Sequence, residues 1–164
     1  MMRKTNSEID LLLRNLDDAY DGKAWHGPTL RGSIRRVPVP QAAWRPYAQR
    51  HNIAEIVLHA AYWKYAARRR LRGDKRGSFP LKGSDWFVVP AKLTDQAWRQ
   101  YIALLESEHY LLREAVTGLR PSQLQEVPRG SKVDNMKLIY GIAAHDVYHT
   151  GQIRLLKSLH GSRK

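Results

Sequence analysis

The spacing of the apolar residues constrains this chain most, because they recur at steps of three and four in four separate stretches. Those steps follow the 3.6-residue period of an α-helix, so each stretch predicts a helix with one buried side. Thr5 to Glu8 has capping-box spacing, and the later helices are expected to begin near Asn52, Thr94 and Asp134. A glycine follows each stretch and is expected to close the helix in the left-handed conformation. These glycines are Gly22, Gly73, Gly118 and Gly161. The sequence therefore predicts an all-α four-helix bundle.

The connections between these helices are long. At 164 residues the chain is most simply one domain, 1–164, and it shows no internal repeat. Two segments, 26–46 and 74–93, are rich in Pro and Gly, and loops of that length are usually binding loops or lids, or else disordered. Trp25, Trp44 and Trp86 favour ordered loops, since each large apolar side chain needs a place to pack. We therefore predict a bundle with long crossover loops.

The composition excludes several classes of protein. The chain has no cysteine, which removes disulfides, thiolate nucleophiles and Cys-based zinc sites. The apolar run near the amino end is too short for a secretory signal, and no segment approaches the roughly 20 apolar residues of a membrane span. We expect a cytoplasmic protein without a membrane segment.

The chain is strongly basic. It has 28 Lys and Arg against 15 Asp and Glu, a formal net charge of +13. Such a field attracts nucleic acid, anionic lipid or acidic metabolites. However, no aromatic-interleaved binding motif accompanies the charge, so a solvated basic face is favoured over a nucleic-acid site.

Polar residues interrupt the apolar face of the last predicted helix. Steps of four and three connect Leu138, Ile142, His145, His149, Gln152, Leu156 and Leu159. This is the spacing of a helix seam in a bundle, and its three central positions are polar. His145 and His149 project from adjacent turns, a spacing that lets both imidazoles bind one metal ion.

A third ligand must come from another helix, since two imidazoles do not complete a metal site. His59 is the best candidate, because it lies on an apolar seam of the second predicted helix. A satisfied core histidine remains the alternative for this residue. His109 lies beside Glu106 and Glu108 and is expected to be exposed. Asp146 is expected to point away from the histidine pair and to form a salt bridge.

Four parts of the chain resemble one known family. The strings are "GIAAHDVYHTGQIRLLK", "HNIAEIVLHAAYWKYAARRRLRG", "AWHGPTL" and "SDWF". The first resembles the last-helix signature of the DinB-like (DinB/YfiT-like) family, with His, three residues, His and then Gly-Gln-Ile. The second is similar to the pattern of that family's second helix, in which a metal-binding histidine precedes an aromatic residue. The resemblance spans nearly the whole chain.

The resemblance implies a four-helix bundle that holds a divalent metal, nickel or zinc, through a triad that falls on His59, His145 and His149. It also implies activity toward a small-molecule substrate with a low-molecular-weight thiol, as in bacillithiol-dependent transferases and a mycothiol-dependent isomerase. Three imidazoles leave a coordination position open, as in catalytic zinc sites. Gln152 could hydrogen-bond a ligand imidazole or a water at the metal, or join helices as a buried amide. His26 is a further candidate for the site, although a role at a helix start also explains it.

Two functional classes remain open. One is a metal-dependent enzyme, a thiol transferase or a hydrolase. The other is a stress-response or nucleic-acid-associated binding protein with a structural metal.

A homodimer is also expected, formed through the first and third helices, because Tyr20 and Trp98 extend beyond a single buried stripe.

Overall fold

The computed structural model describes residues 7–162, and within this range it contains helices and no strands. The four long helices are α1 (Ser7–Tyr20), α4 (Ile53–Arg72), α5 (Asp95–Thr117) and α6 (Asn135–Gly161). Two short helices, α2 (Leu30–Ile34) and α3 (Val39–Ala43), interrupt the connection from α1 to α4, and the 3-10 helix η1 (Pro121–Gln125) follows α5. The predicted all-α four-helix bundle is confirmed, while Thr5 of the proposed capping box lies outside the described residues.

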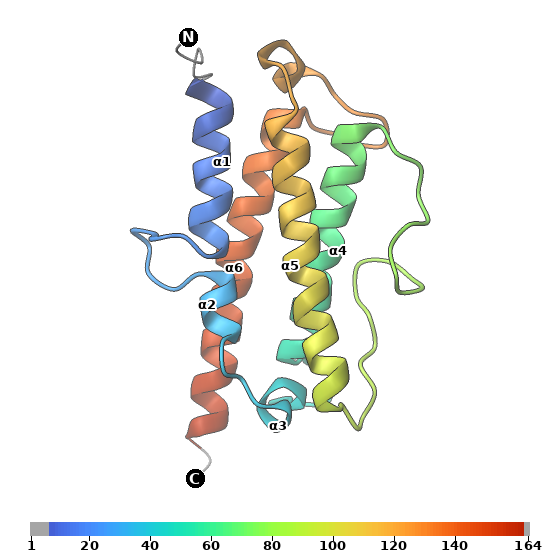
Figure 1. Cartoon of the computed structure of the whole chain (residues 1–164). Helices are drawn as coiled ribbons and strands as arrows, with labels where there is room; N and C mark the ends of the chain where they lie inside the picture. Colours follow the sequence, from blue (N-terminus) through green and yellow to red (C-terminus); the bar gives the residue numbers. More distant parts are fainter. Residues whose placement is uncertain (1–6, 163–164) are drawn as a thin grey trace.

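The four long helices are arranged as a square. Helix α4 packs against α5 and α6, and α1 packs against the same two helices from the opposite corner. Figure 1 shows that α1 and α6 run in one direction, whereas α4 and α5 run in the other. Because α4 and α5 are parallel, the segment between them must return along the length of the bundle (Figure 1). The length of the 74–93 connection therefore follows from the topology.

Local capping fixes where three of the long helices begin. The side chain of Asn52 accepts a hydrogen bond from the backbone N–H of Glu55, and the Glu55 side chain accepts one from the Asn52 backbone in return. The side chains of Thr94 and Asp134 likewise accept one hydrogen bond each, from the backbone N–H of Ala97 in α5 and of Lys137 in α6. Such caps satisfy backbone donors that have no partner within the helix. The predicted starts at Asn52, Thr94 and Asp134 are confirmed.

The helix ends differ from the prediction. Gly73 closes α4 in the left-handed conformation, with φ of 73°. Gly118 follows α5 with a right-handed φ of −79°, and Gly161 is the last residue of α6 itself. Gly22 is not in the left-handed region either. The expected left-handed closure is therefore right for Gly73 and wrong for the other three glycines.

The tryptophans of the connections also divide into two groups. Trp44 and Trp86 pack against the hydrophobic core, as the ordered-loop prediction required. Trp25 is fully exposed, at 101% of its reference area, so the expectation that it packs is wrong. Trp98 and Tyr20, which were expected to supply a dimer face, are 4% and 1% exposed and pack inside the chain itself.

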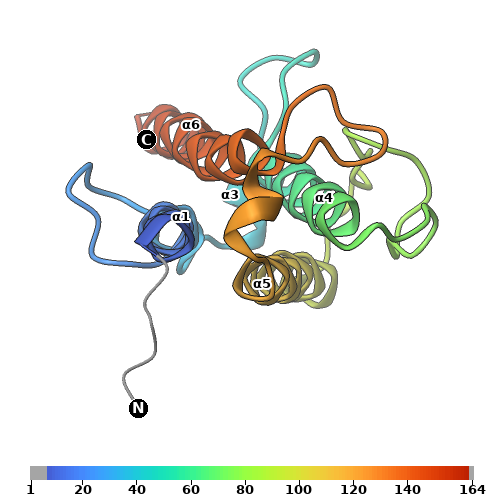
Figure 2. The same cartoon turned by 90° about the horizontal axis from the view of Figure 1, so that it is seen from above.

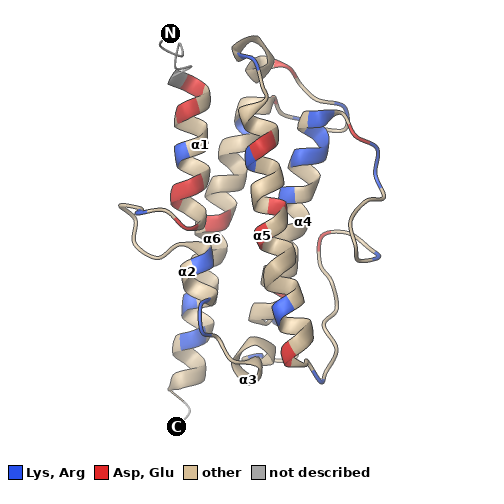
Figure 3. Ribbon diagram, in the orientation of Figure 1, with Lys and Arg blue, Asp and Glu red and all other residues tan. Residues whose placement is uncertain are grey.

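The charges are spread over the surface. On the face shown in Figure 3, Lys and Arg lie on several helices and loops, and acidic residues of α1 and α5 alternate with them. No helix within residues 7–162 is both long enough and apolar enough to cross a membrane.

Candidate metal centre

The three predicted histidines meet between α4 and α6. His59 comes from the middle of α4, and His145 and His149 come from adjacent turns of α6. The Nε2 atom of His145 lies 3.1 Å from Nε2 of His59 and 3.0 Å from Nε2 of His149. Nitrogens that bind one zinc ion tetrahedrally at about 2.0–2.1 Å are roughly 3.3 Å apart. The three side chains are therefore close enough to hold one ion.

The outer nitrogens of two rings have hydrogen-bond partners that determine the tautomer. Nδ1 of His59 lies 3.0 Å from the backbone oxygen of Asp85, which can only accept, so this nitrogen carries the proton. Nδ1 of His149 donates in the same way to Oε1 of Gln152 over 2.7 Å. In a neutral ring the inner nitrogen, Nε2, is then unprotonated and carries a free lone pair. Gln152 therefore orients a site imidazole, one of the two roles considered for it.

The tautomers of His59 and His149 bear on whether these residues fit a metal ion. The lone pair of His149 faces another imidazole nitrogen at 3.0 Å, and that of His59 does so at 3.1 Å. Lone pairs at such distances repel unless a proton or a cation lies between them. One proton on His145 Nε2 cannot satisfy both neighbours, whereas a single cation can. Nδ1 of His145 is buried and has no hydrogen-bond partner among the described residues. The donor set fits a metal ion.

Burial keeps these imidazoles neutral. Desolvation lowers the pKa of His145 to about 3, with further lowering by His149, His59 and Lys64. Desolvation also lowers the pKa of His149 to about 4, although its hydrogen bond to Gln152 opposes the shift. The pKa of His59 is lowered by the same cause. Because only a neutral imidazole can ligate, the site is in its ligand form at neutral pH.

A loop residue that the sequence did not single out supports the site. Asp85, in the crossover between α4 and α5, has a left-handed φ of 67°, which is uncommon outside glycine. Its backbone oxygen accepts from His59, while its carboxylate accepts from Trp63 Nε1 at 2.7 Å. The string "SDWF" contained this residue, but nothing in its spacing linked it to a histidine 26 positions earlier.

An aromatic stack covers one side of His59. The ring of Trp86 stacks on His59, with ring centroids 3.8 Å apart, and its other face stacks on His51 at 3.5 Å. Nδ1 of His51 lies 3.0 Å from Glu55, which also forms a salt bridge with Arg45. The crossover loop thus shields His59 from water on this side.

The buried face of α6 is rotated slightly relative to the predicted seam: it keeps Ile142, His149 and Leu156 and moves by one residue at the positions between them. Leu159, predicted as part of the seam, is 43% exposed, whereas Asp146 is completely buried. The buried positions include Ile139, Ile142, Asp146, His149, Ile153 and Leu156, which also follow steps of three and four. His145 therefore lies at the edge of the packed face and is only partly buried. This rotation gives the histidines an open side.

Asp146 belongs to a second polar group, which we call the lysine cluster. It consists of one residue from each long helix, namely Tyr20, Lys64, His109 and Asp146, each at most 1% exposed. The ammonium group of Lys64 donates to the carboxylate of Asp146 and lies 3.5 Å from Nδ1 of His109. The rings of His109 and Tyr20 stack with centroids 3.8 Å apart. The salt bridge predicted for Asp146 is present.

The position of His109 corrects another prediction. It was expected to be exposed because of its acidic neighbours, but it is 1% exposed. Leu105, His109, Leu112 and Val116 follow steps of four, three and four, the same signal that identified His145 and His149. Burial lowers the pKa of His109 to about 2, and Lys64 and Arg113 lower it further.

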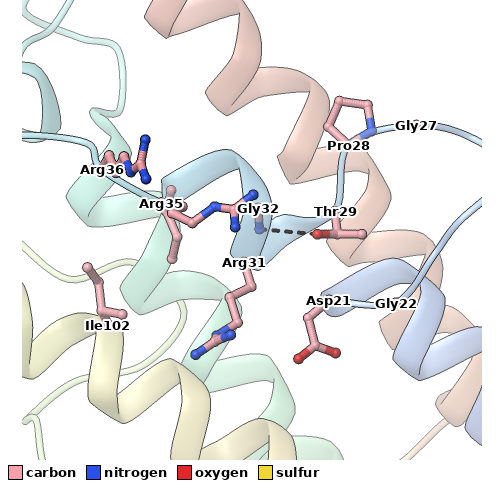
Figure 4. A pocket seen from close by; sticks show the side chains of 11 residues that line it. Asp21, Gly22, Gly27, Pro28, Thr29, Arg31, Gly32, Arg35, Arg36 and Ile102 are labelled. Atoms are coloured by element: carbon pink, nitrogen blue, oxygen red, sulfur yellow. Dashed lines mark hydrogen bonds between the residues drawn. The ribbon is translucent and has the colours of Figure 1, made fainter.

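The structure does not bring His26 to the histidine site. His26 is exposed in the loop between α1 and α2, which projects beyond α1 on the side away from α4 (Figure 2). Near this loop lies a cavity of about 560 Å³ whose walls include Asp21, Thr29 and Arg31 (Figure 4). None of the three site histidines lines this cavity, and Arg31 pairs with Glu106 at 2.9 Å.

A different cavity adjoins the histidines. It has a volume of about 530 Å³, lies between α4 and α6, and is lined by both His59 and His145. Small-molecule sites commonly have volumes of about 300–1,000 Å³. We call this cavity the histidine cleft.

Comparison with known proteins agrees with this arrangement. No curated protein and no solved structure is significantly similar to the chain. A family model described as the DinB superfamily matches residues 24–153, which include α4, α5 and all three site histidines. The match covers most of the chain, and the helical fold is the one that the resemblance implied. The chain belongs to the DinB superfamily.

Proposed function

We propose that the protein is a divalent-metal-dependent enzyme whose ion is held by His59, His145 and His149. The convergence of three neutral imidazole nitrogens, two of which present bare lone pairs, carries this proposal. Three protein ligands leave a coordination position for substrate, unlike the closed shell of a structural zinc site. The histidine cleft provides access from the edge of the bundle.

The residues of the chain have separate tasks in this proposal. Asp85 and Gln152 hold the imidazoles of His59 and His149 in the tautomer that ligates. Trp86 covers His59 and excludes water from that side. When bound, the ion supplies Lewis-acid chemistry, polarising a substrate oxygen or lowering the pKa of a thiol. Nickel and zinc both suit imidazole ligands, and a low-molecular-weight thiol is the co-substrate class that the family resemblance favours.

Metal analysis tests the proposal directly. Protein purified without a histidine tag should contain close to one equivalent of nickel or zinc by mass spectrometry. His59→Ala should reduce this content strongly, and the double variant His145→Ala/His149→Ala should abolish it. His160→Ala, at the far end of α6, is the control and should retain the metal. The three-histidine site is wrong if the His59→Ala protein keeps a full equivalent with unchanged affinity.

The net charge of +13 favours one alternative, a nucleic-acid-associated protein with a structural metal. Affinity for DNA would then fall steeply with rising salt, because binding releases counterions. Filter binding at two salt concentrations separates the two functions, and absence of binding at low salt removes the alternative.

A homodimer remains part of the proposal. Because Tyr20 and Trp98 are buried within the chain, the dimer face must use other residues. Equilibrium sedimentation at high concentration tests it, and a mass near 18.9 kDa would identify a monomer.

A further inference from the structure

The histidine cleft contains a row of three residues along one side of α6. Lys137, Gly141 and His145 are four residues apart, so they lie above one another on successive turns. At a rise of 1.5 Å per residue, the row from Lys137 to His145 is about 12 Å long. All three residues line the cleft. The row therefore connects a cationic side chain with the edge of the histidine site.

Gly141 leaves the middle of this row open. A Cβ atom added at Gly141 would meet nothing within 4 Å apart from the adjoining residues and the backbone of its own helix. On either side of the glycine the cleft is lined mainly by apolar side chains, including Trp63, Leu138 and Ile142. A ligand that follows the row would consequently contact an apolar floor between its two ends.

The charged side chains of the cleft differ in whether they have hydrogen-bond partners. The carboxylate of Asp85 accepts from Trp63 and lies 3.2 Å from Nδ1 of His59. Lys137 is exposed, and its ammonium group has no hydrogen bond or ion pair with another described residue. A further positive group, the guanidinium of Arg70, lies 6.0 Å from the Trp63 ring centre. Of the two charged side chains that line the cleft, Lys137 is the one without a hydrogen-bond or ion-pair partner among residues 7–162, whereas the negative charge of Asp85 lies beside His59.

We propose that the histidine cleft binds an amphiphilic monoanion, with its carboxylate at Lys137 and its apolar body over Gly141, directed toward His145. A single uncommitted lysine matches a singly charged head, and the apolar walls match an alkyl or aryl body. As a statement about the substrate of the enzyme, this inference rests on the proposed function. Binding to the cleft itself does not depend on the metal.

The experiment uses two probes that differ only in the head group, octanoate and octan-1-ol. Their dissociation constants are measured by isothermal titration calorimetry with chelator-treated protein, so that no metal can bind the carboxylate. Octanoate should bind roughly twofold to fivefold more tightly, the range expected for one exposed ion pair. Lys137→Met should remove this preference while leaving octan-1-ol binding unchanged.

Two glycine variants provide a matched pair for the apolar body. Gly141→Leu should weaken both probes at least about tenfold, because the new side chain fills the floor of the cleft. Gly151→Leu, on the same helix and equally free of neighbours within 4 Å, lies outside the cleft and should change neither. Both variants replace a helical glycine by a better helix former, so their melting temperatures should not fall.

Each outcome decides a separate point. Equal binding of both probes, unaffected by Lys137→Met, would overturn the anionic head. Unchanged binding in Gly141→Leu would overturn the cleft as the binding site. Metal content of the Lys137→Met protein should remain that of the parent. If octanoate binds as described but the histidine variants retain metal, the proposed function fails while the cleft proposal stands.

Discussion

The bundle contains two polar groups side by side, and they differ in whether opposite charges or like groups meet in them. In the lysine cluster a cation and an anion pair directly, and all four residues are at most 1% exposed. In the histidine site three imidazole nitrogens converge, two of them with bare lone pairs, and His145 lies at the edge of a cleft. His145 and Asp146 are neighbours in sequence, yet they serve opposite groups. Mutual pairing indicates a structural role, whereas unshared lone pairs beside an opening indicate a binding role.

Breaking the lysine cluster should have the largest effect. Asp146→Ala leaves the ammonium group of Lys64 buried without a counter-charge, which costs about 3–5 kcal/mol of unfolding free energy. The double variant Lys64→Met/Asp146→Leu should recover most of this loss, because no buried charge remains. Urea unfolding measures both, with the exposed Asp95→Ala as control. A loss below about 1 kcal/mol in Asp146→Ala would show that the pair is not buried as described.

Removing the ion from the histidine site should have the next largest effect. A ligand that binds only the folded state adds about 2.7 kcal/mol at a hundredfold excess over its dissociation constant. Chelator should therefore lower the melting temperature of the parent protein but leave that of His145→Ala/His149→Ala unchanged. Calorimetric scans with and without chelator make the comparison. An equal chelator effect on both proteins would place the metal elsewhere.

Acid should act on the lysine cluster through His109. Its pKa of about 2 in the folded protein lies far below the value of about 6.5 in an unfolded chain. The unfolded chain therefore takes up a proton as pH falls, and the folded protein loses stability. Between pH 8 and pH 5 this loss amounts to about 2 kcal/mol. His109→Phe should reduce the difference in unfolding free energy between these two pH values by that amount, and an unchanged difference would contradict the burial of a neutral imidazole.

The smallest effect should come from loosening the histidine site without removing a ligand. Gln152→Leu deprives Nδ1 of His149 of its acceptor, and loss of such a partner weakens metal binding about 10- to 100-fold. We expect the lower end of this range, because Gln152 is only partly buried and water can replace its oxygen. Competition with a chromogenic chelator measures the affinity. Unchanged affinity would mean that His149 is oriented by packing alone.

The parts of the fold that could be predicted from sequence are those determined by neighbouring residues. Asn52, Thr94 and Asp134 identify helix starts because a cap acts over three residues. Two members of the histidine triad could also be predicted, since the spacing of four residues between His145 and His149 is a local signal. His59 joined them through its position on an apolar seam and through the family resemblance.

The remaining features depend on contacts between distant elements. Steps of three and four fit α6 through His145 or equally through Asp146, and only the packing of α1 and α4 against it selects the second. Apolar periodicity also gives no reason to expect Lys64 to be 0% exposed, because its partner comes from another helix. Asp85 reaches His59 only because the crossover loop returns along α4.

The three ligands lie far apart in the sequence, so folded and unfolded molecules should differ in their affinity for a metal ion. His145 and His149 are close together in any conformation with a helical turn, but His59 lies 86 residues from His145. In an unfolded chain, bringing His59 to the pair requires closing that loop, at an entropic cost of roughly 4 kcal/mol. The native bundle has already closed it. Folded copies would therefore hold an ion several hundredfold more tightly than unfolded copies, and under scarce metal the ion would collect on correctly folded molecules.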